Sequence, residues 1–120
     1  MSADFTHLHV HSNYSLLDST IRIEDLVKTA SNDKMSALAL TDHGNMFGAL
    51  DFYLYAKKYN LKPIIGCEVY LAPGNRLMRG NNTSGDEEVA PYSTSRSGMN
   101  HLILLVQNEI GYQNLCRLVS

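Results

Sequence analysis

Residues 5–12 read FTHLHVHS, which places His7, His9 and His11 at alternate positions. Alternate side chains of a β-strand point to the same face, so this run predicts a first strand with three imidazoles on one side. Three neighbouring imidazoles cost desolvation and side-chain entropy unless something binds them. The pattern favours a metal site on this strand, and the alternative is a polar edge strand whose histidines face water.

The other two histidines lie at the boundaries of further predicted strands. His43 ends the run LALTDHG (38–44), and His101 begins the run HLILLV (101–106). Between them, the apolar stretch PIIGCEVYL (63–71) contains one carboxylate, Glu68, and an ionised Glu is rarely buried alone. We therefore expect Glu68 to bind a cation beside the histidines. The alternatives are a pair with a Lys or Arg from elsewhere in the chain, or exposure on an edge strand.

Strands and helices are expected to alternate along the chain. Four strands are predicted, at residues 5–11, 37–41, 64–71 and 101–106. Three helices are predicted from apolar positions at helical spacing: Ile23, Leu26, Val27 and Ala30; Phe47, Leu50 and Leu54; and Ile110, Leu115, Leu118 and Val119. Repeated β-α-β units predict an α/β fold with a parallel sheet, either open and doubly wound or part of a barrel. Ligands collect at the carboxyl ends of such strands, where His11 and His43 fall.

Composition sets further bounds on the function. The chain has 120 residues, 44% of them hydrophobic, and a net charge of −2. That length suits one ordinary domain, and the slightly acidic balance means that affinity for DNA would have to come from other domains. We find no signal-peptide pattern and no apolar run near the roughly 20 residues of a membrane span, so we expect a cytoplasmic protein without a membrane partner. Cys67 and Cys116 form no CxxC pair and are expected to be reduced.

Residues 72–100 interrupt the alternation. This stretch is rich in Gly, Asn and Ser and nearly free of aliphatic side chains, so it predicts a long surface insertion. Its three arginines would allow a phosphate contact, but Asp86, Glu87 and Glu88 offset their charge. A solvated insertion is therefore the favoured interpretation.

Several short motifs occur in a fixed order along the chain: HVHS (9–12), TDHG (41–44), GCE (66–68) and the strand that begins HL (101–102). Together they resemble successive motifs of the PHP family, named for polymerase and histidinol phosphatase. Three more motifs, YSLLD (14–18), KPIIG (62–66) and GYQNL (111–115), resemble the amino-terminal PHP domains of bacterial DNA polymerase III alpha subunits. The resemblance implies a PHP-type distorted (β/α) barrel. Residues 1–120 would form a partial domain of about four β-α units, with the rest of the PHP domain and the polymerase domains absent.

The resemblance also implies a set of metal ligands for up to three divalent ions, with zinc or manganese expected: His9, His11, Asp18, His43, Glu68 and His101. His9 and His11 would bind one ion, which Glu68 would bridge to a second ion held by His101. Asp18 and His43 would serve a third.

Two further residues, His7 and Asp42, would support the ligands without touching metal. From the residues alone, Asp18 is also a candidate helix cap and Asp42 a candidate turn residue. His101 is the least expected ligand, because barrel sites are uncommon at the start of a strand.

Metal ions in such a set activate water and neutralise phosphate, and no separate protein nucleophile is expected. The resemblance therefore implies a metal-dependent phosphoesterase or 3′-5′ proofreading exonuclease within a replicative DNA polymerase. Its partners would be DNA, reached through the rest of the parent chain, a proofreading exonuclease subunit and a sliding clamp. The alternatives are a free-standing PHP phosphatase for a small phosphomonoester and a non-catalytic scaffold that binds a proofreading subunit. Polymerase chemistry is not expected from these 120 residues alone.

Overall fold

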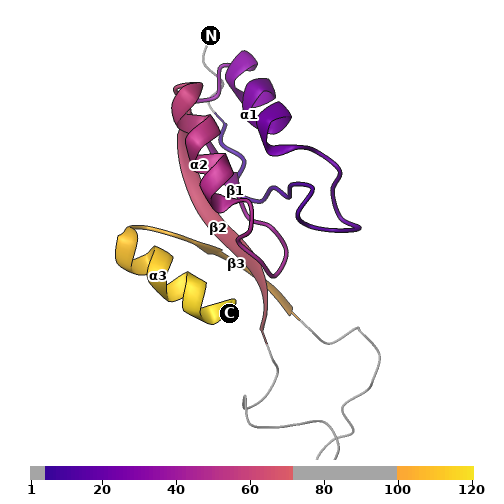
Figure 1. The fold of residues 1–120 in the computed structure, drawn as a ribbon, viewed down its shortest axis with the longest axis vertical. Helices are drawn as coiled ribbons and strands as arrows, with labels where there is room; N and C mark the ends of the chain where they lie inside the picture. The colour runs from indigo at the N-terminus through magenta and orange to yellow at the C-terminus, as the bar shows by residue number, and fades with distance from the viewer. Residues whose placement is uncertain (1–4, 72–99) are drawn as a thin grey trace, which may run out of the picture.

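The structure, a computed structural model, describes residues 5–71 and 100–120. Its elements follow the order α1 (Ile23–Asn32), β1 (Ala37–Leu40), α2 (Ala49–Lys58), β2 (Lys62–Leu71), β3 (Asn100–Leu105) and α3 (Glu109–Leu118). Figure 1 shows these elements with β2 as the long central strand. The mixed α/β class is confirmed, and the predicted insertion lies outside the described residues apart from Asn100, where β3 begins.

The three strands form one sheet in the order β1-β2-β3. β1 and β2 are parallel and joined through α2, as predicted for a β-α-β unit. β3 instead runs antiparallel to β2, with Leu71 opposite Asn100 and Gly66 opposite Leu105. The prediction of a wholly parallel sheet is therefore wrong. An antiparallel neighbour needs no helical crossover, and the sequence between these two strands has no apolar helical pattern.

Residues 5–12 run along the free edge of β1 and pair with it, but they do not form a regular strand. The prediction of a regular first strand is therefore wrong. The backbone N–H of Ala39 donates to the carbonyl of His7 (2.9 Å), and that of Thr41 donates to the carbonyl of Val10 (2.8 Å). The segment advances three residues where β1 advances two, as at a bulge, and the Val10 N–H donates to the Thr41 side chain. Strict alternation of side chains is lost between His7 and Val10.

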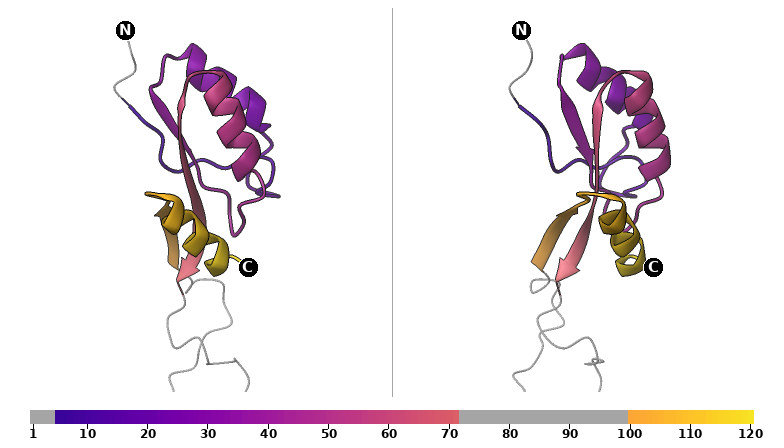
Figure 2. Two further views of the ribbon diagram at one scale, coloured as in Figure 1. Left: turned by 60° about the vertical axis from the view of Figure 1, so that its left-hand side comes forward. Right: turned by 90° about the vertical axis from the view of Figure 1, so that its left-hand side faces the viewer.

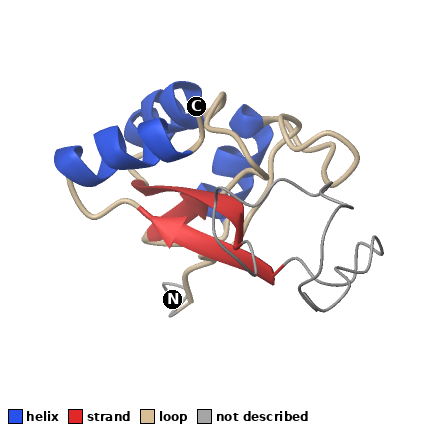
Figure 3. Ribbon diagram, turned by 90° about the horizontal axis from the view of Figure 1, so that it is seen from below, coloured by secondary structure: helices blue, strands red, loops and turns tan. Residues whose placement is uncertain are grey.

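All three helices lie on one face of the sheet (Figures 2 and 3). The core fills the space between α1, α2 and the sheet. It consists of Ile23, Val27, Ala30, Leu38, Leu40, Phe52, Ala56 and Leu61. The apolar positions predicted for α1 are thus confirmed, with Leu26 packed at the margin of the core.

The predicted apolar face of the second helix is wrong. Leu50 and Leu54 are 66% and 56% exposed, whereas Ala49, Phe52 and Ala56 face the core. The buried positions keep helical spacing, and the two alanines let the helix approach the sheet closely while one Phe fills the gap. On α3, Leu115 is buried, and Ile110 and Leu118 remain exposed.

Cys67 is fully buried and Cys116 partly so, and both thiols are free, as predicted. Within residues 5–71 and 100–120, no helix combines the length and apolar character that crossing a bilayer requires.

Candidate metal centre

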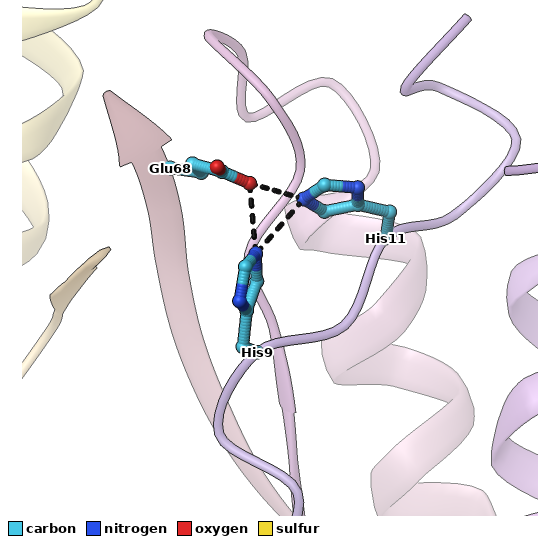
Figure 4. A group of neighbouring side chains, drawn as sticks. All are labelled: His9, His11 and Glu68. Carbon is cyan, nitrogen blue, oxygen red and sulfur yellow. Dashed lines mark hydrogen bonds and ion pairs between the residues drawn. The ribbon is translucent and has the colours of Figure 1, made fainter. Parts of the chain in front are cut away.

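The centre is built around Glu68, a carboxylate on β2 that is only 4% exposed. Its Oε2 lies 2.8 Å from His9 Nε2 and 2.5 Å from His11 Nε2, and its Oε1 contacts His101 Nδ1. Figure 4 shows the first two imidazoles converging on one oxygen of Glu68. The two oxygens of one buried carboxylate thus face histidines from two different parts of the chain.

The fold positions Glu68 where β1 ends. Its backbone N–H donates to the carbonyl of Asp42 (3.0 Å), and its carbonyl accepts from the N–H of Gly44 (2.8 Å). These two bonds extend the parallel pairing past the end of β1 and put His43 beside Glu68. The turn that follows requires Gly44, whose φ of +70° is costly for other residues.

The antiparallel course of β3 explains why His101 belongs to the cluster. His101 lies opposite Tyr70, so the start of β3 adjoins the end of β2. His101 is the least expected ligand from the sequence because, in a parallel sheet, the start of its strand would lie at the edge of the sheet opposite to the other ligands. The antiparallel pairing removes this objection to its location.

His9, His11 and Glu68 each offer a ligand atom, and these atoms lie within 4.8 Å of one another. The Nε2 atoms of His9 and His11 are 3.3 Å apart. Glu68 does not face solvent, and among residues 5–71 and 100–120 it has no ion pair with Lys or Arg. Imidazole nitrogens with a carboxylate oxygen are the donors that zinc, manganese and iron accept in proteins, so this set fits such an ion.

Asp18 and His43 form the second part of the centre. His43 Nδ1 lies 2.8 Å from Asp18 Oδ2, and the same oxygen is 4.0 Å from His11 Nδ1. In the described part of the chain, the other ring nitrogen, His43 Nε2, is buried without a hydrogen-bond partner. A buried, unpaired nitrogen is costly, so this atom too fits a bound ion. Asp18 does not cap α1, whose N-cap is Arg22.

His7 lies apart from the cluster. Its side chain is exposed, and its ring packs edge-on against Phe5 with centroids 4.7 Å apart. The expectation that all three alternate histidines share one face is therefore wrong for His7, and the extra residue in this segment is the physical reason.

Asp42 shapes the turn that carries the ligands. Its carboxylate, 2% exposed, accepts hydrogen bonds from the Ser12 N–H (2.6 Å), the Ser12 hydroxyl (2.7 Å) and the Ser15 hydroxyl (2.6 Å). The Ser15 Oγ in turn accepts from the backbone N–H of His43 (2.9 Å). Asp42 therefore fixes the backbone on both sides of the centre instead of orienting the imidazole of His43 directly.

Tyr70 is a neighbour of the centre that sequence reasoning missed. Its ring lies 4.9 Å from that of His43 and 4.7 Å from that of His101, measured between centroids. Strand alternation could have identified it, because Tyr70 occupies the next position on the face of β2 that carries Glu68.

The electrostatics of the cluster favour an ionised Glu68. Burial by itself would raise the pKa of this carboxyl, but hydrogen bonds from His101, His9 and His11 outweigh burial and lower the pKa to about 2. The centre therefore presents a buried anion at neutral pH, as a cation site requires.

Comparison with known proteins gives one family and one group of relatives. The family model described as PHP domain matches residues 7–120. The DNA polymerase III subunit alpha of Borreliella burgdorferi is 47% identical over 97% of this chain and 9% of its own length. The subunit of Treponema pallidum is 49% identical over the same shares, and that of Aquifex aeolicus is 42% identical over 98% and 10%. The chain thus spans about a tenth of the length of these curated relatives.

Two solved structures resemble the fold. One, from Bifidobacterium adolescentis, is named as a metal-dependent phosphoesterase; it gives a TM-score of 0.57 at 16% identity, over 98% of this chain and 34% of that one. The other is an amidohydrolase from Chromobacterium violaceum with bound sulfate and no metal. It gives a TM-score of 0.52 at 28% identity, over 57% of this chain and 24% of that one. The first likeness concerns the fold alone.

Proposed function

Because the chain belongs to the PHP domain family, we propose that residues 1–120 are part of the PHP domain of a bacterial DNA polymerase III alpha subunit and hold divalent metal ions for phosphoester hydrolysis. One observation carries the metal assignment: a carboxylate buried on a central strand is surrounded by three imidazoles. A fold would rarely keep such a group without a cation to neutralise it.

Glu68 is proposed as the residue shared between two ions. Its Oε2 faces His9 and His11, while its Oε1 faces His101, so the carboxylate separates two groups of donors. Asp18 and His43 form a third group, in which His43 Nε2 is the free donor. This geometry supports the set of six ligands that the resemblance implied.

Bound divalent ions would spread the charge of a phosphate and lower the pKa of a water ligand. The chain's own residues supply the rest. Glu68 and Asp18 would provide negative charge. The Ser12 and Ser15 hydroxyls are buried and donate hydrogen bonds to the Asp42 carboxylate, so neither is exposed to a substrate as a nucleophile. The reaction class that fits is hydrolysis by metal-activated water, which includes 3′-5′ exonuclease action on DNA.

The alternatives differ in what they expect of the parent protein. If this were a free-standing phosphatase, we would expect its relatives to be of similar length, whereas the relatives it matches are about ten times longer than this chain. A non-catalytic scaffold would keep the fold without retaining metal. We propose that contact with DNA, with a proofreading exonuclease subunit and with a sliding clamp involves the rest of the parent chain, and that the protein acts in the cytoplasm.

The test is hydrolysis of 5′-labelled single-stranded DNA by the full-length protein. We expect shortening of the strand from its 3′ end, loss of this activity on chelation, and recovery on adding zinc or manganese. His11→Ala should abolish it, whereas Leu50→Ala, on the exposed side of α2, should not. Equal activity in the His11→Ala variant would refute the proposal.

A further inference from the structure

A hollow of about 700 Å³ opens directly beside the metal centre. Asp18 and His43 belong to both, and Tyr70 joins the hollow to the cluster by packing against the rings of His43 and His101. A group attached to a phosphate at the centre would therefore extend into this space. Its volume lies in the range of about 300–1,000 Å³ that is usual for small-molecule sites.

The walls of the hollow are mostly aromatic and aliphatic. Tyr14, Phe47 and Tyr70 contribute rings that are 38%, 76% and 48% exposed, and Leu16 and Leu17 are more exposed still. Among the described residues that line it there is no Lys or Arg. The hollow is therefore unsuited to a second phosphate and suited to a flat, uncharged group that can pack against rings.

Hydrogen bonds hold two walls of the hollow together. Asn45 donates through Nδ2 to the carbonyls of Tyr14 (3.1 Å) and His43 (3.2 Å), and its Oδ1 accepts from the N–H of Phe47 (3.2 Å). The rings of Tyr14 and Phe47 lie edge to face, with centroids 6.5 Å apart. The wall is thus fixed to the turn that carries His43.

Backbone strain occurs in the same wall. Leu17 adopts a φ of +74°, a left-handed conformation that costs a non-glycine residue on the order of 1–3 kcal/mol. Its side chain is fully exposed, so no packing within the described residues repays that cost. Strain of this kind is typical of ligand-binding positions.

We propose that this hollow binds the base of the terminal nucleotide while its phosphodiester lies at the metal centre. The inference rests on the proposed function and makes it more specific. It adds to the proposed exonuclease action a subsite for the terminal base, which a small phosphomonoester without a ring would leave empty. Stacking of a base on an aromatic side chain tolerates any base, as removal of arbitrary 3′ nucleotides requires.

Phe47→Ala tests the proposal, with Leu50→Ala as the matched control. Within residues 5–71 and 100–120 both side chains are highly exposed and lie outside the core, so neither change should disturb this part of the fold, and only Phe47 lines the hollow. In the full-length protein, we expect Phe47→Ala to raise the KM for a strand with a normal 3′ nucleotide by about five- to a hundredfold. The KM for a strand with an abasic 3′ residue should change by less than about twofold. An equal rise for both strands, or an equal rise in Leu50→Ala, would overturn the proposal.

A second readout is independent of hydrolysis. A strand with 2-aminopurine at its 3′ end loses fluorescence when that base stacks, and binding can be measured with metal present if a phosphorothioate that resists hydrolysis replaces the terminal phosphodiester. Quenching should be weaker with Phe47→Ala than with the wild type or Leu50→Ala, and identical quenching in all three would refute base binding. Absence of metal and of hydrolysis, with this difference in quenching intact, would instead refute the proposed function alone.

Discussion

At Glu68, burial and hydrogen bonding act on the pKa of one carboxyl in opposite directions, and hydrogen bonding prevails. The pKa falls from an ordinary value of 4.5 to about 2. Folding therefore favours the ionised form, and this stabilisation is complete above about pH 4.5 and is lost as the pH falls toward 2.

The lowered pKa of Glu68 predicts that the free energy of unfolding depends on pH. In urea unfolding of the metal-free 120-residue chain, the difference between the wild type and Glu68→Gln should shrink as the pH is lowered from 4.5 toward 2. A difference that stays constant over this range would show that the carboxylate is not held by the histidines.

At the level of single residues, most members of the candidate centre could be identified from the sequence. An isolated carboxylate within an apolar strand is a strong signal, because burial of Glu68 demands a partner. The position of His7 could not be predicted, since one extra residue in an irregular segment turns side chains to another face. The roles of Ser12 and Ser15 were also missed, because hydrogen bonds to Asp42 depend on how two distant segments meet.

At the scale of elements, α2 shows how a helix is oriented by its small residues. The large exposed side chains Leu50 and Leu54 suggested the wrong face, while Ala49 and Ala56 permit the close contact that buries Phe52. A ranking by hydrophobicity places Leu above Ala, but it does not indicate which face of a helix is small enough to pack closely against a sheet.

The contribution of each face of α2 to the free energy of unfolding can be measured. Phe52→Ala should lower the free energy of unfolding by about 3–5 kcal/mol, because a fully buried ring is removed from the core. Leu50→Ala should change it by less than about 0.5 kcal/mol. Denaturant unfolding of the two variants checks this, and comparable losses would mean that the helix packs through its other face.

The direction of β3 was not predictable from its own residues. The apolar run at 101–106 is compatible with a parallel or an antiparallel neighbour, and only the connection decides between them. The sequence predicts residues 72–100 as an insertion within a β-α-β pattern, and that pattern does not indicate the antiparallel pairing of β2 with β3. That pairing places His101 at the centre.

At the scale of the whole molecule, apolar side chains remain uncovered on several elements. Ile110 and Leu118 on α3 are 68% and 70% exposed, and Leu102 and Leu105 on the edge strand β3 are each 42% exposed. Exposed apolar patches and open strand edges promote association.

We therefore predict that the 120-residue chain self-associates when purified alone. Sedimentation velocity over a range of concentrations should show oligomers, and the double change Ile110→Glu and Leu118→Glu should shift them toward monomer. A wild-type monomer at every concentration would show that these side chains are not an association surface.

The central claim is that Glu68 and its histidines hold metal, and elemental analysis of the full-length protein after dialysis tests it most directly. The wild type should retain divalent metal, with zinc or manganese expected. Glu24→Gln, the same chemical change at a half-buried α1 residue that pairs with Lys28, should retain as much. Glu68→Gln should lose most of it, since the anionic ligand shared by the histidines is removed. A wild type without metal, or equal metal in all three proteins, would contradict the account.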